Sequence, residues 1–445
     1  MKKIIAIGLI GVALVTNSAT ANAKEWSLQE CIAYALQNNI SLQKSNLSRL
    51  NAKEDILLSK AQLFPSLSAS TNQMANYTPW VESGISSDGY ARSSVDKVYY
   101  NGSYGVNANW TVWNGNRNTN TVKLNKLVEQ KAAIDSATTA NNIQEKIAQL
   151  YVQILYSNEA IKVNKESLKS SIQNEERGKE MLKVGKMSKA DLAQLTAQRA
   201  QDEYNVINAE STTRNFKRQL KQLLQITDEE EFEVTSTIST DEMAMQLIPS
   251  LNDVYTSALN SRPEIKAYQN AIDQSNLQIK IAKAQNLPTV GVNASVGTNT
   301  TSMNDNKWGE QLKTNFNAGA GISVSIPIFD QRSKKTALNK ANIQKENALL
   351  DLKNEQTNLW ATIEEYWLQA TTNQNRFRSA QESTKSAKES YELLSEQFKL
   401  GLKNIVELRN GKDKLLQAEQ NELESKYMTI LNIDMLKFYQ NGTLK

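Results

Sequence analysis

The chain has 445 residues, of which 40% are hydrophobic and 22% charged, and its formal net charge is +4. So small a charge excludes the strongly basic surface of a nucleic-acid-binding protein or of an anchor to acidic lipid. The sequence has no histidine and one cysteine, Cys31. It therefore lacks the usual general base, the commonest metal ligand and any intrachain disulfide. We expect a protein that is not an enzyme and holds no metal or cofactor, with Cys31 buried on the apolar side of a helix.

Residues 1–23 have the pattern of a secretory signal peptide. Two lysines follow Met1, an apolar core runs from Ile4 to Val15, and Ala21-Asn22-Ala23 fits the small residues of a cleavage site. The apolar run is shorter than the ~20 residues that span a bilayer. We therefore expect cleavage before Lys24 rather than a retained membrane anchor.

The rest of the chain contains an internal repeat. One set of residues recurs after 223 positions: Leu28, Ala35, Leu36, Ala61, Gln62 and Pro65 become Leu251, Ala258, Leu259, Ala284, Gln285 and Pro288. A second set recurs after 216 positions: Ile147, Gln153, Glu166, Ser167, Gly185 and Leu192 become Ile363, Gln369, Glu382, Ser383, Gly401 and Leu408. Two constant offsets indicate a duplicated fold. We expect a first repeat at 24–225, an acidic connector at 226–250 with a short strand near 232–235, and a second repeat at 251–445.

Each repeat is predicted to begin with a helix, over 28–63 and over 251–286. Ser27 and Glu30 have the spacing of a capping box, and Ser250 stands at the equivalent N-cap. The prolines that follow end both helices.

Two segments of alternating polarity follow in each repeat, at 66–77 and 103–113, then at 289–299 and 315–328. In the third segment the apolar residues Val290, Val292, Ala294 and Val296 alternate with Gly291, Asn293, Ser295 and Gly297. A period of two over ~10 residues fits a tilted membrane-spanning strand with a wet lumen on its polar side. The alternative is a half-buried sheet of a soluble sandwich. Aromatic residues stand where membrane interfaces would lie, at Tyr104, Trp110, Trp113, Phe316 and Phe329.

Four such strands per chain cannot close a barrel in lipid, where a sheet edge must find a partner. About eight strands is the practical minimum, and eight leave a lumen filled by side chains. We therefore expect a homotrimer with a 12-stranded β-barrel joined to a tunnel of 12 helical columns.

A very long helix is predicted after each strand pair, over about 118–183 and 333–399. Gly185 and Gly401 end these helices, and final helices follow at 189–225 and 404–440. A helix of ~65 residues extends ~100 Å and needs neighbours along its length. One contact line is Ile143, Ile147, Leu150, Ile154, Ile161 and Leu168, and a second is Ala148, Tyr151 and Leu155. With two contact lines the helix can pack against a neighbour on each side, as a helix in the wall of a cylinder must. From the helices alone, a filament-like coiled coil or a plain antiparallel bundle is the alternative.

Several local stretches resemble the TolC family of outer-membrane efflux proteins. They are Trp26-Ser27-Leu28, Ala61-Gln62-Leu63-Phe64-Pro65, Ala284-Gln285-Asn286-Leu287-Pro288, Ile326-Pro327-Ile328-Phe329-Asp330, Phe398-Lys399-Leu400-Gly401 and Ile405-Val406-Glu407-Leu408. Their order and duplication extend the resemblance over essentially the whole mature sequence. It implies a passive channel in the outer membrane of a Gram-negative bacterium, with most of the chain in the periplasm. The implied task is the exit duct of a tripartite efflux or type I secretion system.

The resemblance also implies where partners and a gate would lie. The hairpin tips would meet a periplasmic adaptor protein that is linked to an inner-membrane pump, through Gly185, Lys186, Met187, Gly401 and Leu402. Relatives hold the closed tunnel near the tips with polar links and a ring of carboxylates. By position Glu407 stands for one ring acid and Asn410 for the other, Phe398 replaces a linking tyrosine, Lys403 replaces an arginine, and Asp191 keeps an acidic partner. We therefore expect different closing contacts and weaker block by cations, the alternative for Lys403 and Glu407 being a solvated helix pair.

Two other functions fit parts of the pattern. A periplasmic adaptor also has coiled-coil hairpins but would lack two pairs of membrane-length strands. A trimeric adhesin or structural coiled coil would predict no duplication and no conductance.

Overall fold

The computed structural model describes residues 25–79, 84–85, 92–93, 97–227, 232–235 and 240–444. The expected signal peptide and the acidic run from Asp228 to Glu231 lie outside these residues. The chain forms two compact units. The first comprises the chain up to Gln37, Glu145–Gln246 and Thr372–Leu431, and the second comprises Asn38–Gln144, Leu247–Thr371 and Asn432–Lys445.

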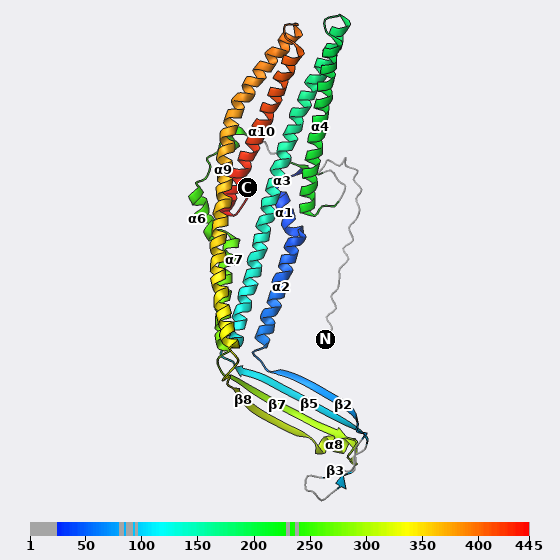
Figure 1. Ribbon diagram of the computed structural model, residues 1–445, viewed down its shortest axis with the longest axis vertical. Helices are drawn as coiled ribbons and strands as arrows, with labels where there is room; N and C mark the ends of the chain where they lie inside the picture. Colours follow the sequence, from blue (N-terminus) through cyan, green and yellow to red (C-terminus); the bar gives the residue numbers. More distant parts are fainter. Residues whose placement is uncertain are drawn as a thin grey trace, which may run out of the picture. The chain divides into compact units, whose positions relative to one another are not determined.

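The second unit contains an antiparallel sheet of four strands in the order β2-β5-β7-β8 (Figure 1). The strands are β2 (Ser66–Tyr77), β5 (Val98–Trp113), β7 (Thr289–Thr301) and β8 (Asn317–Ser325). The two repeats meet where β5 pairs with β7. β8 is shorter than predicted and stops before Pro327, which has no N–H to donate to a strand partner. A two-stranded ribbon of β3 (Gly84–Ile85) and β4 (Arg92–Ser93) follows β2.

The strand register aligns the apolar residues of all four strands on one face of the sheet. One such row is Leu67, Ala108, Ala294 and Ala320, and the next is Ala69, Val106, Val296 and Ala318. The opposite face carries small uncharged residues, as in the row Ser68, Asn107, Ser295 and Gly319. We call these the apolar face and the polar face. Cross-strand partners share a face, so the predicted alternation becomes two continuous surfaces.

The first helix of each repeat is divided, so the prediction of single helices over 28–63 and 251–286 was wrong. The first is α1 (Leu28–Asn38) and α2 (Ile40–Ala61), and the second is α6 (Leu251–Ser261) and α7 (Pro263–Ala284). Asn39 is extended and its side chain accepts the N–H groups of two residues of α2. Arg262 is extended because the next residue is Pro263, which disfavours helical backbone before it and takes the first position of α7.

The predicted start of the first helix is confirmed in atomic detail. The Ser27 N–H donates to Glu30 Oε2 (2.8 Å), and the Glu30 N–H donates to Ser27 Oγ (3.2 Å). This reciprocal pair is the capping box. Ser250 stands at the N-cap of α6 as expected, without a capping bond from its side chain.

The four longest helices are α3 (Arg117–Lys183), α4 (Lys189–Leu224), α9 (Ser333–Lys399) and α10 (Ile405–Asn441). Their bounds agree with the predicted ones to within one residue. The predicted contact lines are buried at Ile143, Ile147, Leu150 and Ile154 and at Ala148, Tyr151 and Leu155. None of the helices in the described residues is long and apolar enough to cross a membrane.

The first unit has a small mixed layer beside α3. β1 (Glu25–Trp26) pairs in parallel with β6 (Glu233–Val234), the short strand expected in the connector. The Tyr151 hydroxyl donates to the Thr235 carbonyl at 2.8 Å. The Trp26 ring packs against the rings of Tyr34 and Phe232. The short helix α5 (Asp241–Ala244) adds Ala244 to a core with Phe377 and Ile430.

Candidate functional site

The two hairpin turns have the same backbone conformation. Gly185 and Gly401 take φ values of +73° and +76°, which only glycine adopts without strain. The Lys186 N–H donates to the Met181 carbonyl (2.8 Å), and the Leu402 N–H donates to the Gln397 carbonyl (2.9 Å). These are the long-range bonds of Schellman caps. The predicted turn positions are thus confirmed, since each glycine ends one helix of a hairpin.

The turns expose aliphatic side chains to solvent. Val184 is 69% exposed, Leu400 73% and Leu402 70%. Met187, which we expected beside them as a contact residue, instead packs against a buried cluster of Leu195, Phe398, Ile405 and Leu408. Each turn thus exposes aliphatic side chains to water, which water does not favour. We call Val184, Leu400 and Leu402 the tip residues.

Phe398 lies inside this cluster and is only 4% exposed. It therefore packs α9 against α4 and α10 and does not occupy the position of a polar link. A tyrosine link exists two turns earlier on α9, where the Tyr391 hydroxyl and Ser170 Oγ of α3 lie 2.7 Å apart. This pair was not predicted from the sequence, although Tyr391 precedes Phe398 by one heptad and so lies on the same side of α9.

The predicted pair Lys403 and Glu407 forms an ion pair in the first turn of α10. Lys403 Nζ lies 2.6 Å from Glu407 Oε1, and the Glu407 N–H donates to Asn404 Oδ1. The bond from Lys403, together with a backbone bond from Asn404, holds the pKa of Glu407 below its ordinary value. Glu407 is therefore a carboxylate at neutral pH. Both side chains are more than one third exposed, so this pair stabilises the fold little.

The two remaining gate candidates take no part in that ion pair. Ser188 is the N-cap of α4: its Oγ accepts the Asp191 N–H (3.0 Å), and its hydroxyl donates to the Asp191 carboxylate (2.7 Å). Asn410 is exposed on α10, one turn after Glu407. The structure thus holds the Asp191 carboxylate against the capping serine of α4 and leaves Asn410 exposed.

A buried charged cluster, which the sequence analysis missed, joins three helices of the first unit. Lys412 of α10 forms an ion pair with Asp202 of α4 and also donates to Ser171 Oγ of α3. Its ammonium donates to the Ser167 carbonyl at 2.6 Å as well. The side chains of Lys412 and Asp202 are 6% and 2% exposed, respectively. Burial lowers the pKa of Lys412, which Asp202 opposes.

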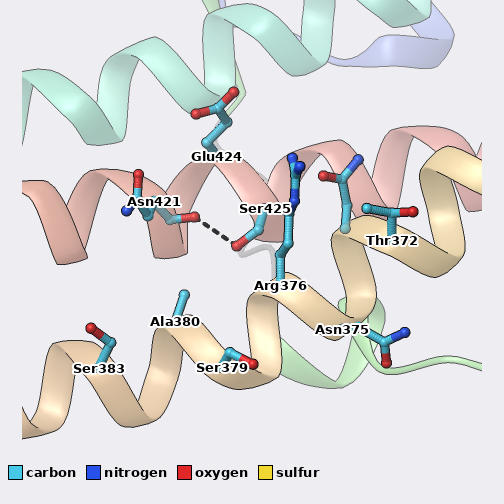
Figure 2. Close-up of a pocket in the computed structure, with 10 residues that line it drawn as sticks. Thr372, Asn375, Arg376, Ser379, Ala380, Ser383, Asn421, Glu424 and Ser425 are labelled. Atoms are coloured by element: carbon cyan, nitrogen blue, oxygen red, sulfur yellow. Dashed lines mark hydrogen bonds between the residues drawn. The ribbon is translucent and has the colours of Figure 1, made fainter.

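An open hollow of about 730 Å³ lies between α9 and α10 in the same unit (Figure 2). Its lining consists mostly of short uncharged polar side chains: Thr372, Asn373, Asn375, Ser379, Ser383, Asn421 and Ser425, with Ala380, Arg376 and Glu424. The Ser425 hydroxyl donates to the Asn421 carbonyl (2.6 Å). No nucleophile stands beside a base here. Across the residues that the structure describes, no group of three potential metal ligands occurs.

The predicted interface aromatics lie on or beside the sheet. The Trp110 indole N–H donates to the Leu63 carbonyl (2.8 Å), where α2 leads into β2. Trp113, Phe316 and Phe329 are 39%, 60% and 85% exposed. Tyr104 is half-buried and contacts Trp308. Tyr100, expected at the same interface as Tyr104, is 62% exposed, and Tyr77 and Trp308 are exposed without having been predicted.

Comparison with known proteins agrees with this architecture. The family model described as outer membrane efflux protein matches residues 31–224 and 254–432, one segment for each repeat. The toxin and drug export protein A of Aggregatibacter actinomycetemcomitans is 22% identical over 414 residues, which cover 92% of this chain and 84% of that protein. The outer membrane protein TolC of Salmonella enteritidis is 21% identical over 457 residues, with 100% and 87% covered.

Solved structures show the same fold. The Campylobacter jejuni CmeC outer membrane channel has a TM-score of 0.78 at 17% sequence identity, over 99% of this chain and 95% of that one. The matched segments of the family model include the first long hairpin, the second one up to residue 432, and all four strands of the main sheet. The chain therefore belongs to the outer membrane efflux protein family.

Proposed function

We propose that three copies of this chain form one passive duct, through which a pump elsewhere drives its cargo out of the cell. Membership of the family makes the chain an outer-membrane efflux or secretion duct. It also decides against the adaptor and the adhesin. The number of copies, the gate and the partners are the parts that we propose here.

The sheet is the observation that carries the proposal. Its apolar face runs in register across all four strands, and β2 and β8 are its two edges in the described chain. In lipid, each unpaired backbone group at such an edge would cost several kcal/mol. Pairing β8 of one copy with β2 of the next removes both edges. Three copies supply twelve strands, enough for a lumen that is not filled by side chains.

The polar face would line the lumen of this barrel. It carries mostly serine, asparagine, threonine and glycine, with Met74 and Tyr99 toward one end, and no charged residue occurs in its paired rows. Such a lining stays wet but selects little by charge. This suits a conduit that contributes a path of limited size, while the energy comes from a pump.

We propose that the gate lies near the tips and is held by two different sets of contacts. Within one chain, the pairs Tyr391–Ser170 and Lys412–Asp202 hold α9 and α10 to α3 and α4. Around the threefold axis, the carboxylates of Glu407 would form a ring that attracts cations. Asn410 removes a second ring of charge, so block by cations should be weaker than with two rings.

The tip residues are the proposed surface for a periplasmic adaptor. They are apolar and exposed at both turns, as a docking surface requires. Lys186 follows Gly185 in the first turn and is exposed, so a crosslinker placed there would reach a bound protein.

Covalent linking of the sheet edges tests the proposed assembly. The variant with both Ser68→Cys and Gly319→Cys carries one thiol on each edge strand, and both positions lie on the polar face. A bismaleimide should link the purified protein into dimers and trimers on a denaturing gel. Each single variant should give neither product, because one edge then lacks a thiol. Native Cys31 is buried and does not compete. A double variant that stays a single chain would overturn the barrel.

A further inference from the structure

The short helix α8 (Trp308–Thr314) is fixed against the end of β7 by one buried side chain (Figure 1). Gln311 is 4% exposed. Its amide N–H groups donate to the carbonyls of Thr301, Asn304 and Asn306, and its Oε1 accepts the Thr301 N–H at 2.8 Å. In addition, Thr298 Oγ1 donates to the Leu312 carbonyl (2.7 Å). So many bonds give α8 a defined place on the sheet.

That place is on the apolar face. Tyr104 and Thr298 are direct partners in the strand register, and they share a face with Val106 and Val296 because side chains two apart point the same way. The Trp308 ring meets the Tyr104 ring edge to face, with centroids 6.1 Å apart. The Trp308 indole N–H also lies 3.4 Å from the Tyr104 hydroxyl, which accepts from Gln73 at 2.8 Å. Helix α8 thus lies over the face that carries the aliphatic residues.

Next to α8, the aliphatic residues of that face give way to polar ones, although Ala75 and Val98 lie on the same face farther along β2 and β5. Along β7 it carries Val292, Ala294 and Val296, followed by Thr298 and Thr300. Along β2, Leu67 and Ala69 give way to Thr71 and Gln73. Aromatic residues gather at this boundary and are exposed: Trp308 by 59%, Tyr100 by 62% and Phe316 by 60%. The exposed residues of α8 besides Trp308 include Glu310 and Lys313.

We propose that α8 is a membrane-interface helix, which places Trp308 at the boundary between acyl chains and headgroups in the outer leaflet. An indole ring favours that boundary because its body is apolar and its N–H is polar. A helix with one side held by protein and charged residues beside an exposed tryptophan suits the same depth. The inference rests on the proposed function, since the apolar face must meet lipid. The new element is α8, a helix in the loop between β7 and β8, which would contact lipid in addition to the strands.

Spin labels at three positions test the proposal in the full-length protein reconstituted in phosphatidylcholine bilayers. Gly309→Cys lies on α8, Gly319→Cys on the polar face, and Ile322→Cys on the apolar face. An added Cβ meets no heavy atom within 4 Å at either glycine, and Ile322 is 76% exposed, so all three tolerate a label. Collision rates with oxygen, which concentrates in the membrane, and with a water-soluble nickel complex report depth.

The expected order of the oxygen-to-nickel ratio is 322 highest, 309 intermediate and 319 lowest. Adding Gln311→Leu removes the bonds that hold α8, so the ratio at 309 should fall to that at 319, while 319 and 322 stay unchanged. If the ratios at positions 322 and 319 do not differ, the proposed barrel is wrong. If these two ratios differ as expected but the ratio at 309 equals that at 319 without the Gln311→Leu change, only the proposal of an interface helix is wrong. A label at 309 that neither reagent reaches would mean that a neighbouring copy covers α8, which also overturns the proposal.

Discussion

Lys412 of α10 and Asp202 of α4 form an ion pair that is almost fully withdrawn from solvent. The two residues come from different repeats and lie 210 positions apart in the chain. Ser171 of α3 completes the cluster. One contact therefore joins the hairpin of the first repeat to that of the second.

Removing one partner of this pair should destabilise the protein strongly. Lys412→Met leaves the Asp202 carboxylate buried without its cation, and such a change typically costs about 3–5 kcal/mol. The double variant with Asp202→Leu should recover most of the loss, because it removes both charges. Thermal unfolding followed by circular dichroism checks the order of the midpoints.

A solvent-exposed pair is the matched control for that series. Lys162 and Glu159 lie 2.6 Å apart on α3, but the lysine side chain is 69% exposed. Lys162→Met should therefore cost less than about 1 kcal/mol. Equal losses for Lys412→Met and Lys162→Met would refute a special role of the buried pair.

The second prediction concerns block of the channel by divalent cations. Glu407→Gln should weaken block at neutral pH, and Asn410→Asp should strengthen it by adding a second carboxylate per chain. Since the pKa of Glu407 lies below its ordinary value of 4.5, the charge persists above pH 4.5 and disappears as pH falls through the lowered value. Single-channel current against cation concentration measures the effect. If block by cations is unchanged in both variants, the proposed ring of Glu407 carboxylates is not the site where cations block the channel.

The third prediction concerns the tips. A photocrosslinking residue at Lys186 or Leu402 should capture a periplasmic adaptor in cells. Tyr204, on α4, is 63% exposed and serves as the control. It should capture no adaptor, because it lies more than three turns from the hairpin turn. Capture at Tyr204 but not at the turns would contradict the tip assignment.

The fourth prediction concerns Cys31, which is fully buried. Burial, followed by the neighbouring Glu30 charge, raises the pKa of the Cys31 thiol from 9.0 to about 12. Because the pKa is raised in the folded state, the thiol stabilises the fold fully below pH 9.0 and loses that contribution as pH rises toward 12. A maleimide should label Cys31 only in denaturant. Rapid labelling of the native protein at pH 8 would be inconsistent with this burial.

The sequence predicted the features that follow from a local pattern. The offsets of 223 and 216 residues predicted the duplication, and the period of two at Val290–Val296 predicted a strand with two unlike faces. Glycine at 185 and 401 predicted the turns, because few other residues adopt a positive φ there. Those features depend on residues that are close together in the chain.

The features that were missed depend on contacts between distant residues or on one overlooked residue. Lys412 resembles any helix-surface lysine until Asp202 is placed against it. Likewise Gln311 has no pattern that predicts its bonds to Thr301. The break at Arg262 is different, since Pro263 was visible in the sequence and should have divided the helix.

Recording single-channel currents from the purified protein in a planar lipid bilayer tests the duct most directly, provided that the mass of the inserted particle is measured on the same sample. We expect long-lived current steps of uniform size from particles of three chains, and small closed-state currents that grow when Lys412→Met loosens the hairpins. A folded, monomeric protein that never produces current steps in lipid would contradict it.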